Sequence, residues 1–430
     1  MHINEIKRVI VSQKEEIDEI FKNEQIIERE FGRNNIERYL SHPNILTVLG
    51  IRRCGKSIFS LQVLGNKKIG YINFDDERLV GLHAENLELI LQAFYELYGT
   101  DLEYILLDEP QNIERWELFA NRLRRTKKII ITGSNSKILS GDLATHLTGR
   151  HMDVTLFPFS FKEFLRYRGL IFSEEDQYST KVISSIRNYL KEYTEIGGFP
   201  EVYKFGKKAL LRLYEDIINK DIFGRYNIRH KKTFKDMARY LISNFSGEFT
   251  YNKLKNIFAV KDVHTVKNWV DYLSATYLVF TLERFSYKLK EQSIAPKKIY
   301  TIDVGLADMI GFKPTERRGA VVENLVFLEL LRRQSYQELD SEVYYWKDPQ
   351  QREVDFIVKE KTSVKQLIQV CTNLEELGTK EREINSLLRA SKELRCTALL
   401  VITEEYEAVE KIGDKSVCFV PLWKWLLEQK

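Results

Sequence analysis

The eight residues from Gly50 to Ser57 constrain the fold of this chain more than any other segment. They read Gly-Ile-Arg-Arg-Cys-Gly-Lys-Ser, follow the apolar run Ile45–Leu49, and lead into the amphipathic run Ile58–Leu64. A strand, a glycine loop ending in Lys-Ser and a helix form a P-loop in its required context. The glycines let backbone N–H groups surround a phosphate, and the helix N-terminus adds its dipole to the attraction. The sequence therefore predicts an α/β fold with a parallel sheet and a triphosphate at this loop.

Two side chains of the loop carry most of the predicted chemistry. Lys56 is expected to reach the outer phosphates of ATP, and the Ser57 hydroxyl is expected to hold Mg²⁺. The alternative is an ordinary turn between a strand and a helix. The full set of residues predicted to contact the nucleotide is Gly50, Arg52, Arg53, Cys54, Gly55, Lys56, Ser57, Ser134 and Asn135.

A second apolar run supplies the acids that such a site needs. Tyr104–Leu107 reads as a buried parallel strand, and Asp108 and Glu109 follow it directly. Ligands of open α/β sheets bind at the carboxyl ends of the strands. We therefore expect Asp108 to bind in the Mg²⁺ shell and Glu109 to orient and polarise the attacking water. The alternative is a pair of surface carboxylates.

Polar residues after two further strands complete the predicted site. Ser134 and Asn135 follow Ile129–Thr132, where they could bond the γ-phosphate or the water, or cap the next helix. Arg150 stands just before the strand-like segment Val154–Phe157. An arginine near the γ-phosphate neutralises charge that develops during hydrolysis, so Arg150 is a catalytic candidate. The alternative is a solvated loop charge.

These strings stand in the order of a known family. Gly-Ile-Arg-Arg-Cys-Gly-Lys-Ser, Leu-Leu-Asp-Glu-Pro-Gln, Thr-Gly-Ser-Asn, Leu-Thr-Gly-Arg and, downstream, Gly-Gly-Phe-Pro-Glu resemble the AAA-type ATPases of archaea and bacteria that carry a C-terminal domain of unknown function. The resemblance covers essentially the whole chain. It implies that Ser134 and Asn135 occupy the sensor position of that family and that Arg150 occupies its arginine position.

Length and charge limit what the rest of the chain can be. A chain of 430 residues is expected to hold two or three domains. Its net charge of +4 is too small for global attraction to nucleic acid, so any such binding needs a local patch. Four scattered cysteines show neither a metal-ligand spacing nor a disulfide pattern, which fits a cytoplasmic protein. No apolar run is long enough to predict a membrane span.

The predicted domains are four. Residues 1–160 form the P-loop core with a helical lead-in, in which Ser12 and Glu15 have capping-box spacing. Residues 161–235 form a helical lid, where Arg225 serves a neighbouring site or pairs with an acid. Residues 236–305 read as a winged helix, and residues 306–430 as a smaller α/β domain. The second helix of the winged helix and its wing present residues that could contact DNA: His264, Thr265, Lys267, Asn268, Lys288, Lys290, Lys297 and Lys298.

The last domain has the layout of a restriction-endonuclease-like core. Glu323 lies in a helix pattern, Asp355 in a strand, and Gln369 in the next strand. A nuclease of this type needs acids for Mg²⁺ and a lysine beside the scissile phosphate. Here Gln369 and Cys371 replace the expected Glu and Lys, which predicts a vestigial site, with Lys365 as a remote substitute for the missing cation.

The resulting expectation is a Mg²⁺- and ATP-dependent ATPase whose nucleotide state controls binding of DNA or of a protein partner by its C-terminal domains. The alternatives are a regulator that binds protein without DNA, and an ATP-gated nuclease. A homo-oligomer is compatible with all three, and membrane binding with none.

Overall fold

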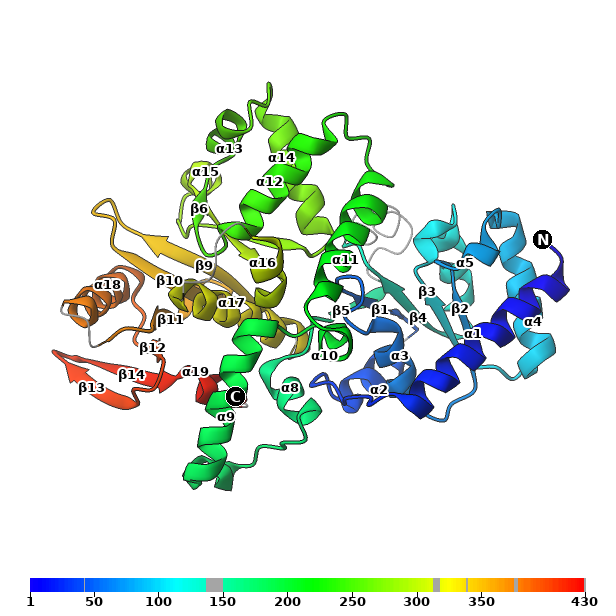
Figure 1. Ribbon diagram of the computed structural model, residues 1–430, viewed down its shortest axis with the longest axis horizontal. Coiled ribbons are helices and arrows are strands. Elements are labelled where there is room, and N and C mark those ends of the chain that lie inside the picture. Colours follow the sequence, from blue (N-terminus) through cyan, green and yellow to red (C-terminus); the bar gives the residue numbers. More distant parts are fainter. Residues whose placement is uncertain (42, 137–149, 312–317, 338, 375–377, 429–430) are drawn as a thin grey trace. The chain divides into compact units, whose positions relative to one another are not determined.

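A computed structural model describes residues 1–41, 43–136, 150–311, 318–337, 339–374 and 378–428 (Figure 1). The chain divides into two compact units. Unit 1 contains residues 1–158 with 275–277, and unit 2 contains residues 159–274 and 278–430.

Unit 1 is built on a five-stranded parallel sheet in the order β2-β3-β4-β1-β5. Its strands are β1 (Ile45–Leu49), β2 (Ile69–Asn73), β3 (Tyr104–Asp108), β4 (Lys128–Gly133) and β5 (His151–Thr155). Every residue of β1 is buried, as its unbroken apolar run predicts for a central parallel strand. The predicted α/β fold with a parallel sheet is confirmed.

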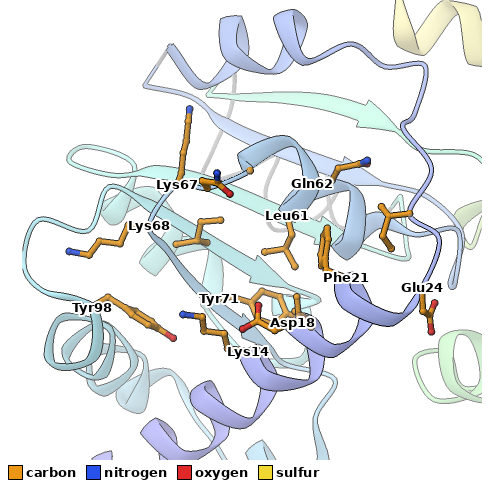
Figure 2. Close-up of a pocket in the computed structure, with 15 residues that line it drawn as sticks. Lys14, Asp18, Phe21, Glu24, Leu61, Gln62, Lys67, Lys68, Tyr71 and Tyr98 are labelled. Atoms are coloured by element: carbon orange, nitrogen blue, oxygen red, sulfur yellow. The ribbon is translucent and has the colours of Figure 1, made fainter.

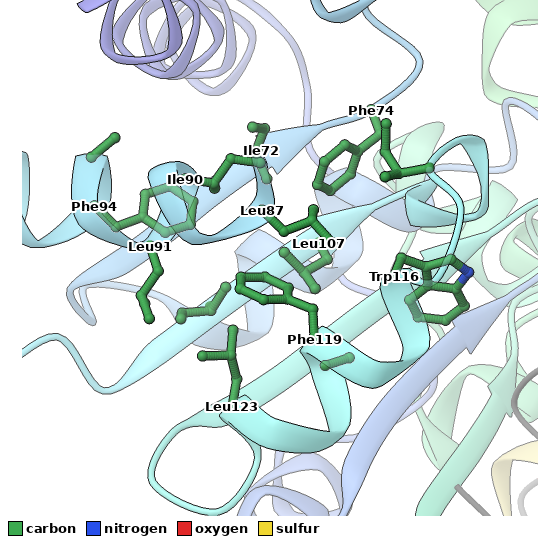
Figure 3. Close-up of a cluster of buried hydrophobic side chains, with 14 of the residues drawn as sticks. Ile72, Phe74, Leu87, Ile90, Leu91, Phe94, Leu107, Trp116, Phe119 and Leu123 are labelled. Atoms are coloured by element: carbon green, nitrogen blue, oxygen red, sulfur yellow. The ribbon is translucent and has the colours of Figure 1, made fainter. Parts of the chain in front are cut away.

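Helices cover this sheet. They are α1 (Ile3–Asn23), α2 (Arg33–Ser41), α3 (Lys56–Leu64), α4 (Leu87–Tyr98) and α5 (Trp116–Leu123), with short 3₁₀ turns at Glu77–Leu79, Ala84–Asn86 and Pro110–Asn112. Figure 3 shows the apolar cluster between the sheet and two of these helices. Ile72 of β2, Phe74 just after β2 and Leu107 of β3 meet Leu87, Ile90, Leu91 and Phe94 of α4 and Trp116, Phe119 and Leu123 of α5. This core fixes the strand ends that carry the predicted site.

The predicted start of the lead-in helix is wrong. Helix α1 begins at Ile3, so Ser12 lies inside it and its hydroxyl donates to Glu16 (3.1 Å) rather than capping the helix. The helix extends back because Ile6, Val9 and Ile10 continue the apolar stripe and are buried. Glu5 accepts a hydrogen bond from the backbone N–H of His2 (2.7 Å) at the true N-terminus.

Unit 2 begins with helices. These are α8 (Phe161–Tyr167), α9 (Thr180–Ile196), α10 (Pro200–Phe205) and α11 (Lys208–Asp216), with a 3₁₀ turn at Glu174–Tyr178 and a π-helical stretch, η5 (Ile217–Phe223). Ser160 and Glu163 form a complete capping box at the start of α8. The predicted helical character of this segment is therefore correct.

A small three-stranded sheet follows in the order β6-β8-β7. Its elements are α12 (Lys231–Ser243), β6 (Glu248–Phe249), α13 (Tyr251–Ile257), α14 (Val263–Ala275), β7 (Val279–Leu282), α15 (Leu289–Ile294) and β8 (Lys297–Thr301). The helix pair α13 and α14, followed by strands β7 and β8, has the element order that a winged helix predicts.

The remainder of unit 2 is a mixed six-stranded sheet in the order β13-β14-β12-β11-β10-β9. Its strands are β9 (Ser341–Lys347), β10 (Glu353–Glu360), β11 (Ser363–Cys371), β12 (Leu399–Thr403), β13 (Ala408–Ile412) and β14 (Lys415–Pro421). Its helices are α16 (Val304–Ile310), α17 (Arg318–Tyr336), α18 (Thr379–Leu394) and α19 (Leu422–Leu427). Residues of α18 pack with β10, β11 and β12 in one apolar cluster.

Candidate functional site: the P-loop edge and a buried lysine cluster

The strand ends of unit 1 bring the predicted catalytic residues to one edge of the sheet. Gly50 follows β1, Glu109 follows β3, and Ser134 follows β4. The parallel register pairs Leu49 with Gly133 and Asp108 with Thr132, so these three segments leave the sheet side by side. The geometry therefore assembles the two halves of the predicted site.

Two glycines of the loop are required by its backbone. Gly50 has φ +146°, and a Cβ there would lie 2.1 Å from the backbone oxygen of Leu156. Gly55 has φ +95° immediately before α3 begins at Lys56. Residues with side chains rarely adopt these φ values. The loop conformation thus depends on both glycines of the motif.

Lys56 is buried at the start of α3 and faces the acid pair. Its Nζ donates to the backbone oxygen of Ile51 (3.1 Å) and lies 3.7 Å from Oε1 of Glu109. A lysine placed here satisfies its charge within the protein while remaining beside the loop amides. An anion bound by the loop would compete for the same ammonium group.

Asp108 is held by three hydroxyl groups. Tyr71 donates to its Oδ2 (3.1 Å), Thr132 donates to its Oδ1, and Ser57 bonds the same carboxylate. Burial raises the pKa of Asp108, and the charge of Glu109 raises it further, while the Ser57 and Thr132 hydrogen bonds oppose the shift. A divalent cation bound to Ser57 and Asp108 would stabilise the charged carboxylate, so these residues fit Mg²⁺.

Glu109 is held in a strained backbone conformation. Its φ of +52° lies in the left-handed region, which is uncommon for a residue with a side chain. The N–H and the hydroxyl of Ser134 both donate to its Oε2, at 3.1 and 3.0 Å, and Gln111 donates to the same oxygen. Ser134, predicted to touch phosphate or water, thus contacts Glu109, the acid expected to orient that water.

Beside these acids lies a pocket of about 630 Å³. Ser57 and Asp108 line it together with Gln13 and Glu16 of α1 and with Asp75 and Asp76, which follow β2. The pocket reaches the residues expected to hold the metal, so it is where a magnesium-bound phosphate end would meet solvent.

A second pocket of about 650 Å³ lies at the other end of α3 (Figure 2). Leu61 and Gln62 line it with Lys14 of α1, Tyr71 of β2 and Tyr98 of α4. The P-loop residues do not line it. It is therefore separate from the predicted nucleotide site, although Tyr71 borders both pockets.

Sequence reasoning missed Arg29. This buried arginine donates to the backbone oxygen of Cys54 (2.9 Å) in the P-loop and to that of Phe157 after β5. No motif marks it, because it lies in the segment between α1 and α2 with no patterned neighbours. The Cys54 thiol donates to Leu156 O (3.3 Å), so the side chain of Cys54 points into the protein rather than toward a ligand.

The other predicted nucleotide contacts are placed as follows. Arg52 forms an ion pair with Asp75 (2.9 Å), and Arg53 is exposed with φ +63°. Asn135 is buried beside Ser134 at the correct edge of the sheet.

Arg150 is not at this site. It precedes β5, and its backbone oxygen accepts from Ile45 N (3.0 Å), the first residue of β1. Because the strands are parallel, Arg150 lies at the edge of the sheet where they begin. A five-residue strand, about 16 Å long, separates that edge from the P-loop edge. The backbone of Arg150 is therefore remote from the P-loop edge of its own sheet, and its role at a γ-phosphate stays a prediction. Arg225 pairs with Asp221 (3.8 Å), the second of its two predicted roles.

The three residues of the predicted vestigial nuclease site do come together in unit 2. Glu323 lies on α17, Asp355 on β10 and Gln369 on β11. The Asp355 N–H donates to Oε1 of Gln369 (3.3 Å), and Gln369 donates in turn to Glu383 (2.7 Å). The prediction that Lys365 replaces the missing cation is wrong, because its side chain is half-exposed and lies near Glu360 (3.9 Å).

The cation of this cluster is Lys298, which was predicted to touch DNA. It is buried, and its Nζ lies 2.9 Å from Glu323 and 3.1 Å from Asp355. Lys297 is mostly buried and pairs with Glu283. No sequence pattern marks this cluster, since β8 is far along the chain from β10. Among the residues that the structure describes, no group of three or more His, Cys, Asp or Glu is arranged to hold a metal ion.

Comparison with known proteins decides the family. The uncharacterized protein MJ1544 of Methanocaldococcus jannaschii is 36% identical over 431 residues, covering 95% of this chain and 93% of that protein. The chain belongs to the MJ1544 family. A second relative, an uncharacterized protein of Haemophilus influenzae, is 26% identical over 426 residues, covering 94% of this chain and 99% of that protein.

This member of the MJ1544 family matches three described domains. Residues 42–165 match an AAA domain, residues 187–316 a domain of unknown function (DUF8612), and residues 318–425 another (DUF4143). The N-terminal part is therefore an AAA-type P-loop domain. The two C-terminal matches assign no activity.

Solved structures offer only distant likenesses. The Walker-type ATPase PABY2304 of Pyrococcus abyssi has a TM-score of 0.44 at 16% identity, covering 67% of this chain and 97% of that one. Cdc6p of Pyrobaculum aerophilum has a TM-score of 0.28 at 12% identity, covering 72% and 98%. Within the described residues, no helix is both long and apolar enough to span a bilayer.

Proposed function

We propose that this chain binds and hydrolyses ATP with Mg²⁺ at the P-loop edge of unit 1. The observation that carries the proposal is the convergence of Lys56 and Ser57 from one loop with Asp108 and Glu109 from another strand. The loop amides and Lys56 would hold the phosphates, and Ser57 with Asp108 would hold the metal. Bound there, Mg²⁺ would neutralise phosphate charge.

Glu109 is the residue best placed to orient water. Its Oε2 is held by Ser134, whereas its Oε1 faces Lys56 at 3.7 Å. A triphosphate that takes the Lys56 ammonium would release Oε1 to accept a hydrogen bond from water. The role of Ser134 in this proposal is to position Glu109.

Two substitutions test the proposal. Because Gln cannot accept a proton, Glu109→Gln should keep nucleotide binding within a few-fold and lower kcat by roughly 100-fold or more. Lys56→Ala should lose binding itself. Titration calorimetry with Mg²⁺ and ATP measures nucleotide binding, and phosphate release measures kcat.

A matched control lies at the other end of the same strand. Glu103→Gln changes an exposed carboxylate just before β3, at the opposite edge of the sheet, and should hydrolyse ATP normally. Unchanged turnover in Glu109→Gln would remove Glu109 from the mechanism. Absence of binding heat in the unsubstituted chain would remove the nucleotide site as a whole.

A second proposal concerns the output of the ATPase. The order α12-β6-α13-α14-β7-α15-β8 with sheet order β6-β8-β7 supports a winged helix at residues 236–305. On α14, Val266, Trp269 and Val270 are buried, whereas His264, Lys267 and Asn268 are exposed. These exposed side chains of α14 support the proposal that it binds DNA, and the nucleotide at the P-loop would control that binding. If DNA does not bind, the same face supports a protein partner instead.

A further inference from the structure

Unit 2 contains a buried cluster of charged side chains around Lys298. Its ammonium contacts three carboxylates: Glu353 at 2.6 Å, Glu323 at 2.9 Å and Asp355 at 3.1 Å. These acids come from α17 and β10, whereas the lysine comes from β8. Lys298 is 2% exposed, so its charge is satisfied almost entirely by the protein.

The rest of the cluster leaves few free positions. Tyr300 donates to the same Glu323 oxygen (2.7 Å) that Lys298 contacts, and Val370 N donates to the other oxygen of Asp355 (2.9 Å). Lys347 approaches the second oxygen of Glu353 (3.2 Å). Three acids are thus matched by two lysines and by neutral donors. A buried ion cluster is stable only when its members are paired in this way.

This arrangement does not fit the metal that a nuclease-like layout implies. Mg²⁺ would need oxygen ligands at about 2.0–2.1 Å in octahedral geometry. The oxygens of Glu323, Glu353 and Asp355 instead converge on a nitrogen at ammonium distances. Gln369 stands where such a nuclease has its third acid, and its amide is engaged by Asp355 N and Glu383.

The protonation of the cluster is consistent with a fixed internal cation. Burial alone would lower the pKa of Lys298, but the charge of Glu323, followed by those of the other neighbouring acids, outweighs it and holds the pKa well above its usual value. Burial raises the pKa of Glu323, and the charge of Lys298 opposes that shift. The neighbouring acids therefore favour the charged form of Lys298.

We infer that Lys298 occupies the place of the divalent cation in this nuclease-like fold, so that the native cluster takes no metal and cleaves no phosphodiester. The cluster instead ties strand β8 to α17 and β10. Removing the ammonium group, and not the acids, is what would create a metal site here.

Metal titration of substituted full-length chains tests this inference. All variants carry Asp108→Asn, so that the P-loop acid does not bind the probe, and no nucleotide is added. The probe is Mn²⁺ alone, followed by electron paramagnetic resonance of free Mn²⁺ and by thermal unfolding. The parent, which carries Asp108→Asn alone, should neither deplete free Mn²⁺ nor change its unfolding temperature when Mn²⁺ is added.

Lys298→Ala should lower the unfolding temperature and bind Mn²⁺ at least tenfold more tightly than the parent, since Glu323, Glu353 and Asp355 then face one cavity with only the Lys347 ammonium left beside Glu353. Mn²⁺ should restore part of the lost unfolding temperature, and adding Asp355→Asn should abolish both effects. Lys298→Met keeps the aliphatic stem and serves as the second variant if Lys298→Ala does not fold. Lys365→Ala is the control lysine and should behave like the parent.

Three results would overturn the inference. The first is tight Mn²⁺ binding by the parent that disappears with Asp355→Asn. The second is Mn²⁺-dependent nicking of plasmid DNA by the parent with the same dependence. The third is unchanged metal affinity in both Lys298 variants. None of these results bears on ATP binding at Lys56, which calorimetry measures separately.

Discussion

At the scale of single residues, the candidate ATPase site depends on how Glu109 is held. Two donors from Ser134, its N–H and its hydroxyl, contact one carboxylate oxygen, and the backbone of Glu109 is strained. Ser134→Ala removes only the hydroxyl. A hydrogen bond to a charged group contributes about 1.5–3 kcal/mol, and the remaining N–H keeps part of that.

We therefore expect Ser134→Ala to lower kcat by roughly tenfold while leaving KM nearly unchanged, because the nucleotide contacts are untouched. Steady-state kinetics measures the split, and Ser134→Thr should restore kcat because it keeps the hydroxyl. Ser41→Ala, at the end of α2, is the control for hydroxyl loss. A rise in KM with normal kcat would mean that Ser134 contacts the nucleotide rather than Glu109.

The residues that the sequence predicts correctly are those fixed by local rules. Glycines with positive φ and carboxylates after an apolar strand lie at one sheet edge because parallel strands all end there. Arg150 was placed by resemblance, and register rather than local sequence puts it at the opposite edge. Lys298 could not be found because its three acids lie 25 to 57 residues further along the chain.

At the scale of secondary-structure elements, the turn between α9 and α10 depends on the cap of α16. Asp303 accepts hydrogen bonds from Leu306 N (2.8 Å) and from Gly198 N (2.6 Å). Gly197 has φ +78°, and a Cβ there would lie 2.1 Å from Asp303. One buried carboxylate thus joins a helix start to a glycine turn 105 residues earlier.

This cap makes stability depend on pH. Burial raises the pKa of Asp303 from 3.8 to about 6, and the hydrogen bonds from Gly198, Leu306 and Gly305 oppose the shift. A carboxyl whose folded pKa is raised binds its proton more tightly in the folded chain. The stability that this carboxyl adds to the folded chain is greatest below about pH 4 and is lost as the pH rises to about 6. Above that pH the group no longer changes the stability.

Asp303→Asn removes this titration. Relative to the variant, the unsubstituted chain should lose up to about 3 kcal/mol of stability between pH 4 and pH 7, because the two pKa values differ by about two units. Thermal unfolding of both proteins across that range measures the difference. Asp308→Asn, on the same helix, should leave the pH dependence in place. Parallel pH profiles for the chain and Asp303→Asn would contradict the assignment.

At the scale of the whole molecule, the balance of charge determines what the proposed ATPase could control. With 66 basic and 62 acidic side chains, the chain has no global attraction for a polyanion. Binding to DNA must therefore come from a local surface. The exposed face of α14 offers one, whereas burial withdraws Lys298 from the wing that the sequence predicted.

We expect labelled duplex DNA to bind at low salt with an affinity that falls as salt rises, because phosphate contacts release counterions. Lys267→Ala should weaken binding of any sequence and reduce the slope of log Kd against log salt by about 1. Lys22→Ala, an exposed lysine near the end of α1, is the matched control and should leave both unchanged.

If nucleotide controls the output, an ATP analogue should change the DNA affinity of the unsubstituted chain but not that of Lys56→Ala. Absence of retardation at low salt would exclude DNA as the ligand of α14, and a protein partner would then be the output that the exposed face supports.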